Sequence, residues 1–185
     1  TLYAQWTPET YTITYDANLG LSAPESQTKI YNTTLTLSSS TPTRTGYTLN
    51  SWNTAANGSG TSYEAGDTYT DNAPITLYAQ WTPETYTITY DANGGTGAPA
   101  PQTKSYGVNA IISSVIPTRT GYSFQNRWAL DSPTASTSFL KGSAYTINSA
   151  ATLYAKWGAN TLTITYNSNG GATPSGGSAT TVTGG

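Results

Sequence analysis

The sequence predicts a mainly β fold with little or no helix, built from small domains in tandem. Thr and Tyr favour strands, and the 185 residues include 15 Tyr. Several short stretches alternate an apolar residue with Thr, which is the period of a half-buried strand. Residues 1–18 return unchanged as residues 76–93 and, with substitutions, as residues 152–169. A block that recurs at this spacing indicates an excerpt from an array of repeated units.

The composition indicates a folded chain and argues against several protein classes. Charged residues make up 9%, the net charge is −2 and aromatic residues make up 12%, whereas disordered chains carry high net charge and few aromatics. No Lys/Arg cluster offers a footprint for nucleic acid, and no window approaches the roughly 18 apolar residues of a membrane span. The absence of Cys fits a reducing compartment or a surface protein without disulfides. Low charge and tandem repetition favour an extracellular location.

The first strand of a unit is expected at residues 11–15, where Tyr, Ile and Tyr alternate with Thr. The same pattern stands at residues 86–90 and 162–166. A turn should follow, because Asn and Gly accept positive φ at little cost. The first copy has Leu19 where the second has Gly94. Either Leu19 has a negative φ or it carries local strain.

Two further strands are expected before the closing one. The second strand runs to Tyr31 and, in the next copy, to Tyr106. The third follows a Pro-Thr-Arg-Thr-Gly-Tyr loop and carries Trp52, matched by Trp128. The second copy inserts one residue in this strand. A bulge must absorb the insertion, since otherwise Trp128 would turn to the opposite face.

The closing strand is expected at residues 76–81. Alternation places Leu77, Ala79 and Trp81 on one face. The opposite face carries Thr76, Tyr78 and Gln80. No stretch has a long helical period, although residues 110–116 are a candidate for one short helical turn.

These strands define the domain organisation. The expected segments are a closing strand of a preceding repeat at 1–6, repeat units at 9–81 and 84–157, and the opening part of a following repeat at 160–185. A tether of four residues, 82–85, includes a Pro and should be stiff. Each unit should then add on the order of 30–40 Å to an extended rod. The two end fragments lack complete cores. We expect them to belong to a longer array rather than to be completed by another chain.

The motifs resemble those of the Listeria–Bacteroides repeat, the internalin B-repeat family. Arg-Thr-Gly-Tyr and Trp-Asn-Thr stand within residues 44–54, Gly-Thr-Ser-Tyr at 60–63, and Thr-Leu-Tyr-Ala-Gln-Trp at 76–81. Leu49 stands where that family usually has an aromatic residue, and Arg127-Trp128-Ala129-Leu130 replaces the Trp-Asn-Thr segment in the second copy. The resemblance implies a β-grasp-like, ubiquitin- or SUMO-like domain, found in strings on bacterial surface and secreted proteins. It implies no catalytic residues and no cofactor.

The residue types also argue against catalysis and against a metal site. There is no His and no Cys, so the commonest general base and metal ligand are missing. Asp91 and Asn93 imitate the start of a calcium loop. The bidentate acid that closes such a loop is absent, so an ordinary turn is the favoured interpretation.

Two further sets of residues are candidate sites. Lys29 and Lys104 recur and could form intramolecular isopeptide bonds, which need an Asn or Asp and a buried acid; a solvated lysine guarding a sheet edge is the favoured alternative. Tyr3, Tyr78 and Tyr154 point away from the Leu/Trp face and could stack sugars. Packing against a second layer or a neighbouring unit is the favoured alternative for these tyrosines. The recurring Trp residues are expected in the core.

The sequence therefore predicts a non-catalytic structural segment of a bacterial surface stalk, spacer or filament. Its expected partners are neighbouring repeats in the same chain and, in a filament, other copies of it. The alternative is an adhesive module that binds a glycan or a host protein through recurrent exposed Tyr. No nucleic acid and no membrane span are expected.

Overall fold

The computed structural model describes residues 1–164, 171 and 179–183. The chain divides into two compact units, Thr1–Glu84 and Thr85–Gly185, called unit 1 and unit 2 below. The end of the expected third opening strand, at Tyr166, and the turn after it lie outside the described residues.

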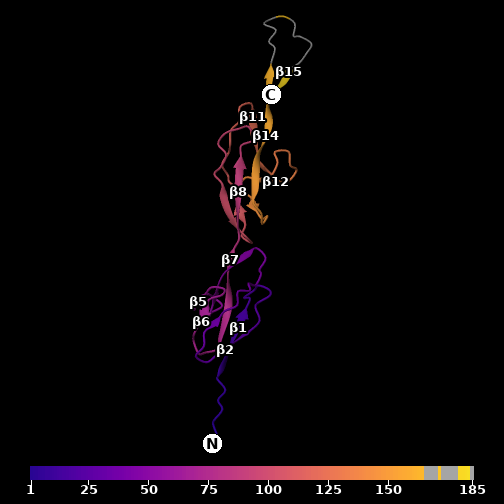
Figure 1. Ribbon diagram of the computed structural model, residues 1–185. Helices are drawn as coiled ribbons and strands as arrows, with labels where there is room; N and C mark the ends of the chain where they lie inside the picture. Colours follow the sequence, from indigo (N-terminus) through magenta and orange to yellow (C-terminus); the bar gives the residue numbers. More distant parts are fainter. Residues whose placement is uncertain (165–170, 172–178, 184–185) are drawn as a thin grey trace. The chain divides into compact units, whose positions relative to one another are not determined.

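Unit 1 is built on one mixed sheet of five strands (Figure 1). Its strands are β1 (Thr10–Asp16), β2 (Gln27–Ile30), β3 (Leu35–Thr36), β4 (Tyr47–Asn53), β5 (Ser62–Tyr63), β6 (Thr68–Tyr69) and β7 (Ile75–Pro83). The order in the sheet is β2-β1-β7-β4-β5. β1 and β7 are parallel, and the other pairs are antiparallel. β3 and β6 form a small second sheet.

Unit 2 repeats this plan and adds one hairpin. Its strands are β8 (Thr85–Asp91), β9 (Gln102–Ser105), β10 (Ala110–Ile111), β11 (Tyr122–Leu130), β12 (Ser138–Leu140), β13 (Ala144–Tyr145), β14 (Ala151–Ile164) and β15 (Ala179–Thr183). The order is β9-β8-β14-β11-β12, with β8 and β14 parallel, and β10 pairs with β13. β15 pairs with the last five residues of β14.

The described residues contain strands and no helix, which confirms the mainly β prediction. The candidate helical turn at residues 110–116 is wrong. The backbone of Ile112 accepts a hydrogen bond from Gly142 N–H and donates one to Ser143 C=O, at 2.8 Å each. These bonds to the segment that enters β13 replace the local bonds that a helical turn requires.

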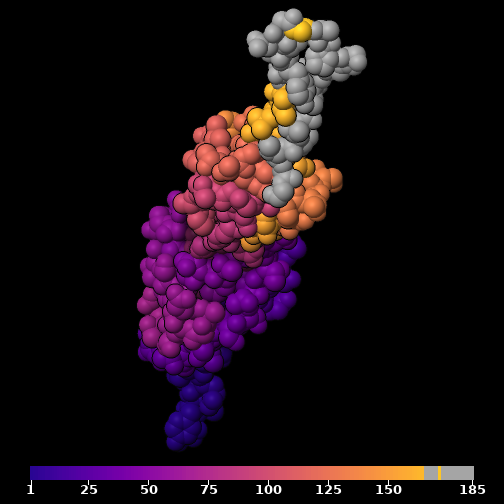
Figure 2. Space-filling model, turned by 90° about the horizontal axis from the view of Figure 1, so that it is seen from above, coloured from indigo at the N-terminus to yellow at the C-terminus, as the bar shows by residue number. Residues whose placement is uncertain are grey.

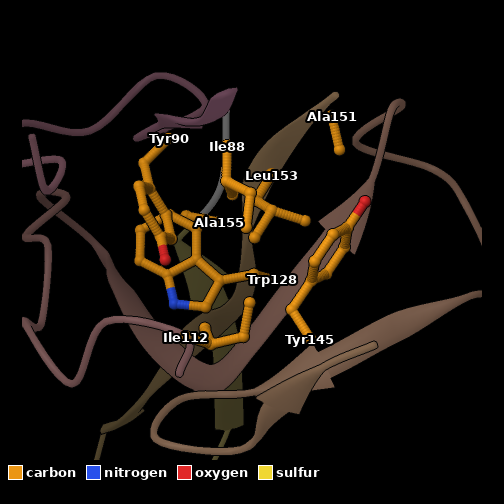
Figure 3. Packing of buried hydrophobic residues seen from close by; sticks show 8 residues of the cluster. All are labelled: Ile88, Tyr90, Ile112, Trp128, Tyr145, Ala151, Leu153 and Ala155. Carbon is orange, nitrogen blue, oxygen red and sulfur yellow. The ribbon is translucent and has the colours of Figure 1, made fainter. Parts of the chain in front are cut away.

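Each core is centred on one tryptophan. In unit 2, Trp128 lies among the side chains of the sheet and of the β10 and β13 segments (Figure 3). The Tyr90 ring meets it edge-on, with centroids 4.9 Å apart. In unit 1, Trp52 meets Tyr15 in the same way at 5.0 Å. Both indoles are fully buried, so the prediction of core tryptophans holds for Trp52 and Trp128.

The tryptophans that close each unit have a second role. Leu77 and Ala79 of β7 are fully buried, as the alternation predicted, whereas Trp81 and Trp157 are only half-buried. In each unit, this indole N–H donates to two carbonyl oxygens of the turn that follows the first strand of the unit. Trp81 Nε1 reaches Ala17 O and Asn18 O, each at 3.0 Å. Trp157 Nε1 reaches Ala92 O at 2.9 Å and Asn93 O at 3.1 Å. The closing strand therefore holds the first turn in place.

The predicted bulge in β11 is confirmed. Phe124 pairs with Trp157 and Trp128 pairs with Ala155, so four steps along β11 match two along β14. β4 has a smaller irregularity between Leu49 and Ser51. Asn126 within the β11 bulge has a φ of 59°. The extra residue is absorbed there, and Trp128 stays on the buried face.

The tether predicted at residues 82–85 is wrong in extent. Thr82 and Pro83 belong to β7 and Thr85 begins β8, so Glu84 alone lies between the strands. Pairing causes the difference, because Pro83 lies opposite Tyr47 in the register and Glu84 N–H donates to Gly46 C=O at 2.9 Å. At the corresponding place after the second closing segment, β14 continues without interruption to Ile164.

Residues 1–9 carry no assigned strand, and it stays a prediction that residues 1–6 are the closing strand of a preceding repeat. Residues 1–6 project from the body of unit 1 as the indigo end of the chain (Figures 1 and 2), whereas Glu9 O accepts the backbone N–H of Tyr31 at 2.8 Å. The identical segment in β7 already pairs with β1 on one side and β4 on the other. Leu2, Tyr3 and Trp6 are therefore solvent-exposed.

Leu19 has a φ of 74°, so of the two alternatives for this position the structure supports strain. Gly94 has a φ of 79° at the matching position. A non-Gly residue in this region costs about 1–2 kcal/mol, and Leu19 is 83% exposed and gains little from burial. We expect Leu19→Gly to stabilise unit 1 by roughly 0.5–1 kcal/mol after the extra freedom of Gly in the unfolded chain is subtracted.

The reciprocal variant, Gly94→Leu, should destabilise unit 2 by a similar amount, because φ at this position is 79°, whereas the added Cβ would make only an ordinary contact with Arg119 at 3.4 Å. Urea unfolding followed by circular dichroism measures both. A Leu19→Gly variant less stable than the parent would contradict this account.

Candidate functional site

A buried lysine against an asparagine recurs in both units. Lys29 is 0% exposed and Lys104 is 2% exposed. The preference for a solvated edge lysine was therefore wrong. β2 and β9 are indeed at the sheet edge, but alternation turns Thr28 outward and Lys29 inward, beneath the loop that leads into β7.

Lys29 Nζ donates to Asn72 Oδ1 at 2.9 Å and lies 3.4 Å from Ile30 O. In unit 2, Lys104 Nζ donates to Asn148 Oδ1 at 2.6 Å and to Ser105 O at 3.2 Å. We call these two contacts the Lys–Asn pairs. Within the described part of the chain, no carboxylate forms an ion pair with either ammonium group.

Each asparagine of the Lys–Asn pairs also holds a turn. Asn72 Oδ1 accepts the backbone N–H of Asn32 at 2.9 Å, and Asn72 Nδ2 donates to Asn32 Oδ1 at 2.8 Å. In unit 2, Asn148 Oδ1 accepts the N–H of Gly107 at 3.2 Å. Sequence reasoning missed both asparagines. Their recurrence at matching positions in the two copies was the available signal.

Asp91 and Asn93, the calcium candidates, make the contacts of a turn. Asp91 Oδ1 accepts the backbone N–H of Asn93 at 2.6 Å. Asn93 Nδ2 donates to Ala155 O at 3.0 Å and thereby fixes the turn to β14. No group of three or more His, Cys, Asp or Glu side chains that could hold a metal occurs among the described residues. Self-capping by Asp is the usual behaviour of such turns.

The tyrosine candidates differ in environment. Tyr78 and Tyr154 are half-buried on the face of β7 and β14 opposite the core. Tyr78 lies between Asp16 of β1 and Asn53 of β4 in the register. Tyr3 is 81% exposed and belongs to the segment without a strand. The structure does not bring Tyr3 and Tyr78 together in one element.

A surface groove in unit 1 was not predicted. Its volume is about 890 Å³, and its lining includes Leu19, Leu21, Arg44, Leu49 and Trp81. Leu19 and Leu21 are 83% and 72% exposed. The corresponding hollow in unit 2 is about 330 Å³. There Gly94 and Thr96 replace the two leucines, so comparison of the two copies could have found this difference.

Burial raises the pKa of four buried tyrosines, Tyr15, Tyr69, Tyr90 and Tyr145. For Tyr15 and Tyr90, a backbone N–H donated to each phenol oxygen, from Ser38 and Ser113, lowers the pKa in part. Each of these two hydroxyls donates to a glutamine, Tyr15 to Gln27 Oε1 at 2.6 Å. The folded chain therefore holds these protons more tightly than the unfolded chain does.

Stability should consequently be complete below the ordinary tyrosine pKa of about 10 and should fall as the pH rises above it. We expect the urea midpoint to drop between pH 9 and 11, both being approximate limits on either side of that value. Tyr15→Phe should weaken the dependence in unit 1, while the raised pKa values of Tyr63 and Tyr69 keep part of it. A midpoint unchanged across this interval in the parent chain would contradict the expectation.

The family can be identified from the sequence. The sequence model of the Listeria–Bacteroides repeat domain matches residues 11–80 and 86–156. The chain belongs to the Listeria–Bacteroides repeat family. The resemblance and the tandem organisation predicted from the motifs are thereby confirmed. The matches cover most of the strands of units 1 and 2, including both Lys–Asn pairs.

Two relatives of the repeat chain come from Evansella cellulosilytica. One, named "Putative Gly-rich membrane protein", is 34% identical over 176 residues, which are 93% of this chain and 20% of the relative. Another, named "Putative membrane protein", is 45% identical over 85 residues, 44% of this chain and 13% of the relative. The chain thus spans a fifth or less of these relatives. No solved structure matches it. Within the described residues, no helix is long and apolar enough to cross a bilayer.

Proposed function

We propose that this chain is a non-catalytic structural segment of a bacterial extracellular stalk, spacer or filament. One observation carries the proposal. In both repeats, the recurrent polar side chains serve the fold itself. Asp91 and Asn93 hold the first turn, Trp157 donates to that turn, and the lysines are buried. Few recurrent groups are left for chemistry on a substrate.

We also propose that each unit has the β-grasp-like fold that the family resemblance implies, and the mixed main sheet supports this proposal. Counting only the five strands of the main sheet of unit 1, the order is second, first, fifth, third, fourth, with the first and last strands parallel and central. Glu84 alone lies between β7 and β8, so the connection between the two units is short, as a spacer made of successive units requires.

Small-angle scattering of the whole chain tests the rod. Each unit should add on the order of 30–40 Å to the maximum dimension. Two units folded against each other would give a globular profile instead, and that profile would contradict the spacer proposal.

The alternative is an adhesive module that binds a glycan or a surface protein. Tyr78 and Tyr154 reach the surface at matching positions, which favours this second candidate. A glycan array and a pull-down with the whole chain separate the two. Saturable binding that is lost in Tyr78→Ala with Tyr154→Ala, and kept in the same-face control Thr76→Ala with Thr152→Ala, would overturn the spacer proposal. No saturable binding is expected.

A further inference from the structure

We propose that each Lys–Asn pair is the site of an intramolecular isopeptide bond, Lys29 to Asn72 in unit 1 and Lys104 to Asn148 in unit 2. The lysine belongs to an edge strand, and the asparagine belongs to the loop just before the central closing strand. Each bond joins residues 43 or 44 positions apart in the sequence. Such a bond forms whether or not the chain serves as a stalk.

The first argument is proximity. Nζ lies 2.9 Å from Oδ1 in unit 1 and 2.6 Å in unit 2. Because a C=O bond is about 1.23 Å long, the carboxamide carbon lies within about 4 Å of Nζ in both units. Well-oriented groups whose reacting atoms lie about 3–3.5 Å apart react with effective molarities of about 10⁵–10⁸ M, so a small movement of Nζ from Oδ1 toward Cγ reaches this range. The hydrogen bonds between Asn72 and Asn32 hold the carboxamide in position.

The second argument is charge. Burying an ammonium group is costly unless a counter-charge compensates it. The partners of Lys29 Nζ are amide oxygens, from Asn72 and Ile30, and those of Lys104 are likewise amide oxygens. Conversion to a neutral amide removes this cost. Among the described residues no carboxylate forms a hydrogen bond or ion pair with either Nζ, so the buried acid expected to assist such bonds is missing and the proton must pass directly from Nζ to the departing Nδ2. The same arrangement persists although the neighbours differ, with Asp71 before Asn72 and Ile147 before Asn148.

The step balances without an added reactant. Lys Nζ first loses one proton to solvent, and its lone pair then attacks Cγ of the asparagine and forms the C–N bond of the new amide. A second Nζ proton passes to Nδ2, the bond between Cγ and Nδ2 breaks, and Nδ2 departs as ammonia, which takes up the proton released at the start. Starting from the ammonium form, the side chains yield one secondary amide and one ammonium ion, so the buried positive charge leaves with the product.

Intact mass spectrometry of the whole purified chain, denatured before measurement, tests the proposal. The expected mass is lower than the sequence mass by two molecules of ammonia. In Lys29→Met and in Lys104→Met, the deficit relative to the sequence mass of that variant should fall to one molecule of ammonia. In the double variant the deficit should disappear. Lys156→Met should leave the deficit at two, because Lys156 Nζ reaches only Ala135 O at 3.4 Å.

Succinimide formation at Asn-Gly is another source of ammonia loss, and locating the cross-link in a peptide separates the two reactions. Three Asn-Gly dipeptides, Asn57-Gly58, Asn93-Gly94 and Asn169-Gly170, can lose ammonia by closing a succinimide, but that deficit would survive both lysine substitutions. Tandem spectrometry should find Lys29 joined to Asn72 in one branched peptide, and Lys104 joined to Asn148 in another. An intact mass equal to the sequence mass overturns the proposal, as does a deficit without branched peptides. The parent chain alone suffices for this measurement if a variant fails to fold.

Discussion

Replacing Trp52 by Ala is expected to unfold unit 1 and to leave unit 2 folded. Trp52 is fully buried at the centre of its cluster, and truncation of a buried Trp or Phe to Ala costs about 3–5 kcal/mol. A domain below about 70–80 residues rarely has more than about 3–5 kcal/mol from its core. The expected loss is therefore as large as the whole stability of the unit.

Hydrogen exchange read by mass spectrometry measures this outcome unit by unit. In Trp52→Ala, amides of β1, β4 and β7 should lose protection, whereas those of β8, β11 and β14 should keep it. Trp128→Ala should give the reverse result. Trp6→Ala is the control, because Trp6 is 90% exposed. Its segment, residues 1–6, has the same sequence as residues 76–81 of β7. Protection retained in unit 1 of Trp52→Ala would show that the indole is not what organises this core.

Gly95→Ala is expected to destabilise unit 2 by about 1–3 kcal/mol, the usual effect of inserting a methyl group where there is no room. A Cβ at this position would lie 2.5 Å from Thr118 O and 2.7 Å from the Trp157 ring. Neither neighbour is the free end of a flexible chain. Relief requires movement of the turn or of the indole that donates to Ala92 O and Asn93 O.

Gly20→Ala should act in the same way in unit 1, because its Cβ would meet Trp81 and Thr43 O. Gly158→Ala is the control, since its Cβ would face the flexible Gln125 side chain at 3.3 Å. Urea midpoints give the stabilities, and a red shift of the Trp fluorescence reports displacement of the indole. If Gly95→Ala and Gly158→Ala were equally stable, the close approach would have no energetic consequence.

Local pattern predicted what depends on near neighbours. Alternation of Tyr, Ile and Thr located β1 and β8, and the requirement that Trp128 stay buried predicted the bulge in β11. The dipeptide Asn-Gly indicated the turn after β8. These features follow from the two-residue period of a strand and from backbone sterics, which a sequence displays directly.

Features that depend on distant partners were missed or misjudged. Lys29 looks like a surface residue between Thr28 and Ile30, and only the loop that carries Asn72 makes it an interior one. The connection between units 1 and 2, residues 82–85, was expected to be a tether, because Pro83 suggests a break in the strand. Pairing across from Tyr47 extends β7 through this proline. Long-range pairing therefore decides both cases, and propensity at one position cannot reveal it.

The parallel pairing of the first and last strands has a mechanical consequence. The chain enters a unit at the start of β1 and leaves at the end of β7, and these strands are neighbours in register from Ile13 opposite Ile75 to Asp16 opposite Tyr78. Tension applied to the ends of a unit slides the two strands in opposite directions along their shared axis. The hydrogen bonds between them must then rupture together in shear rather than singly as in a zipper, which slows forced unfolding. β8 and β14 have the same geometry.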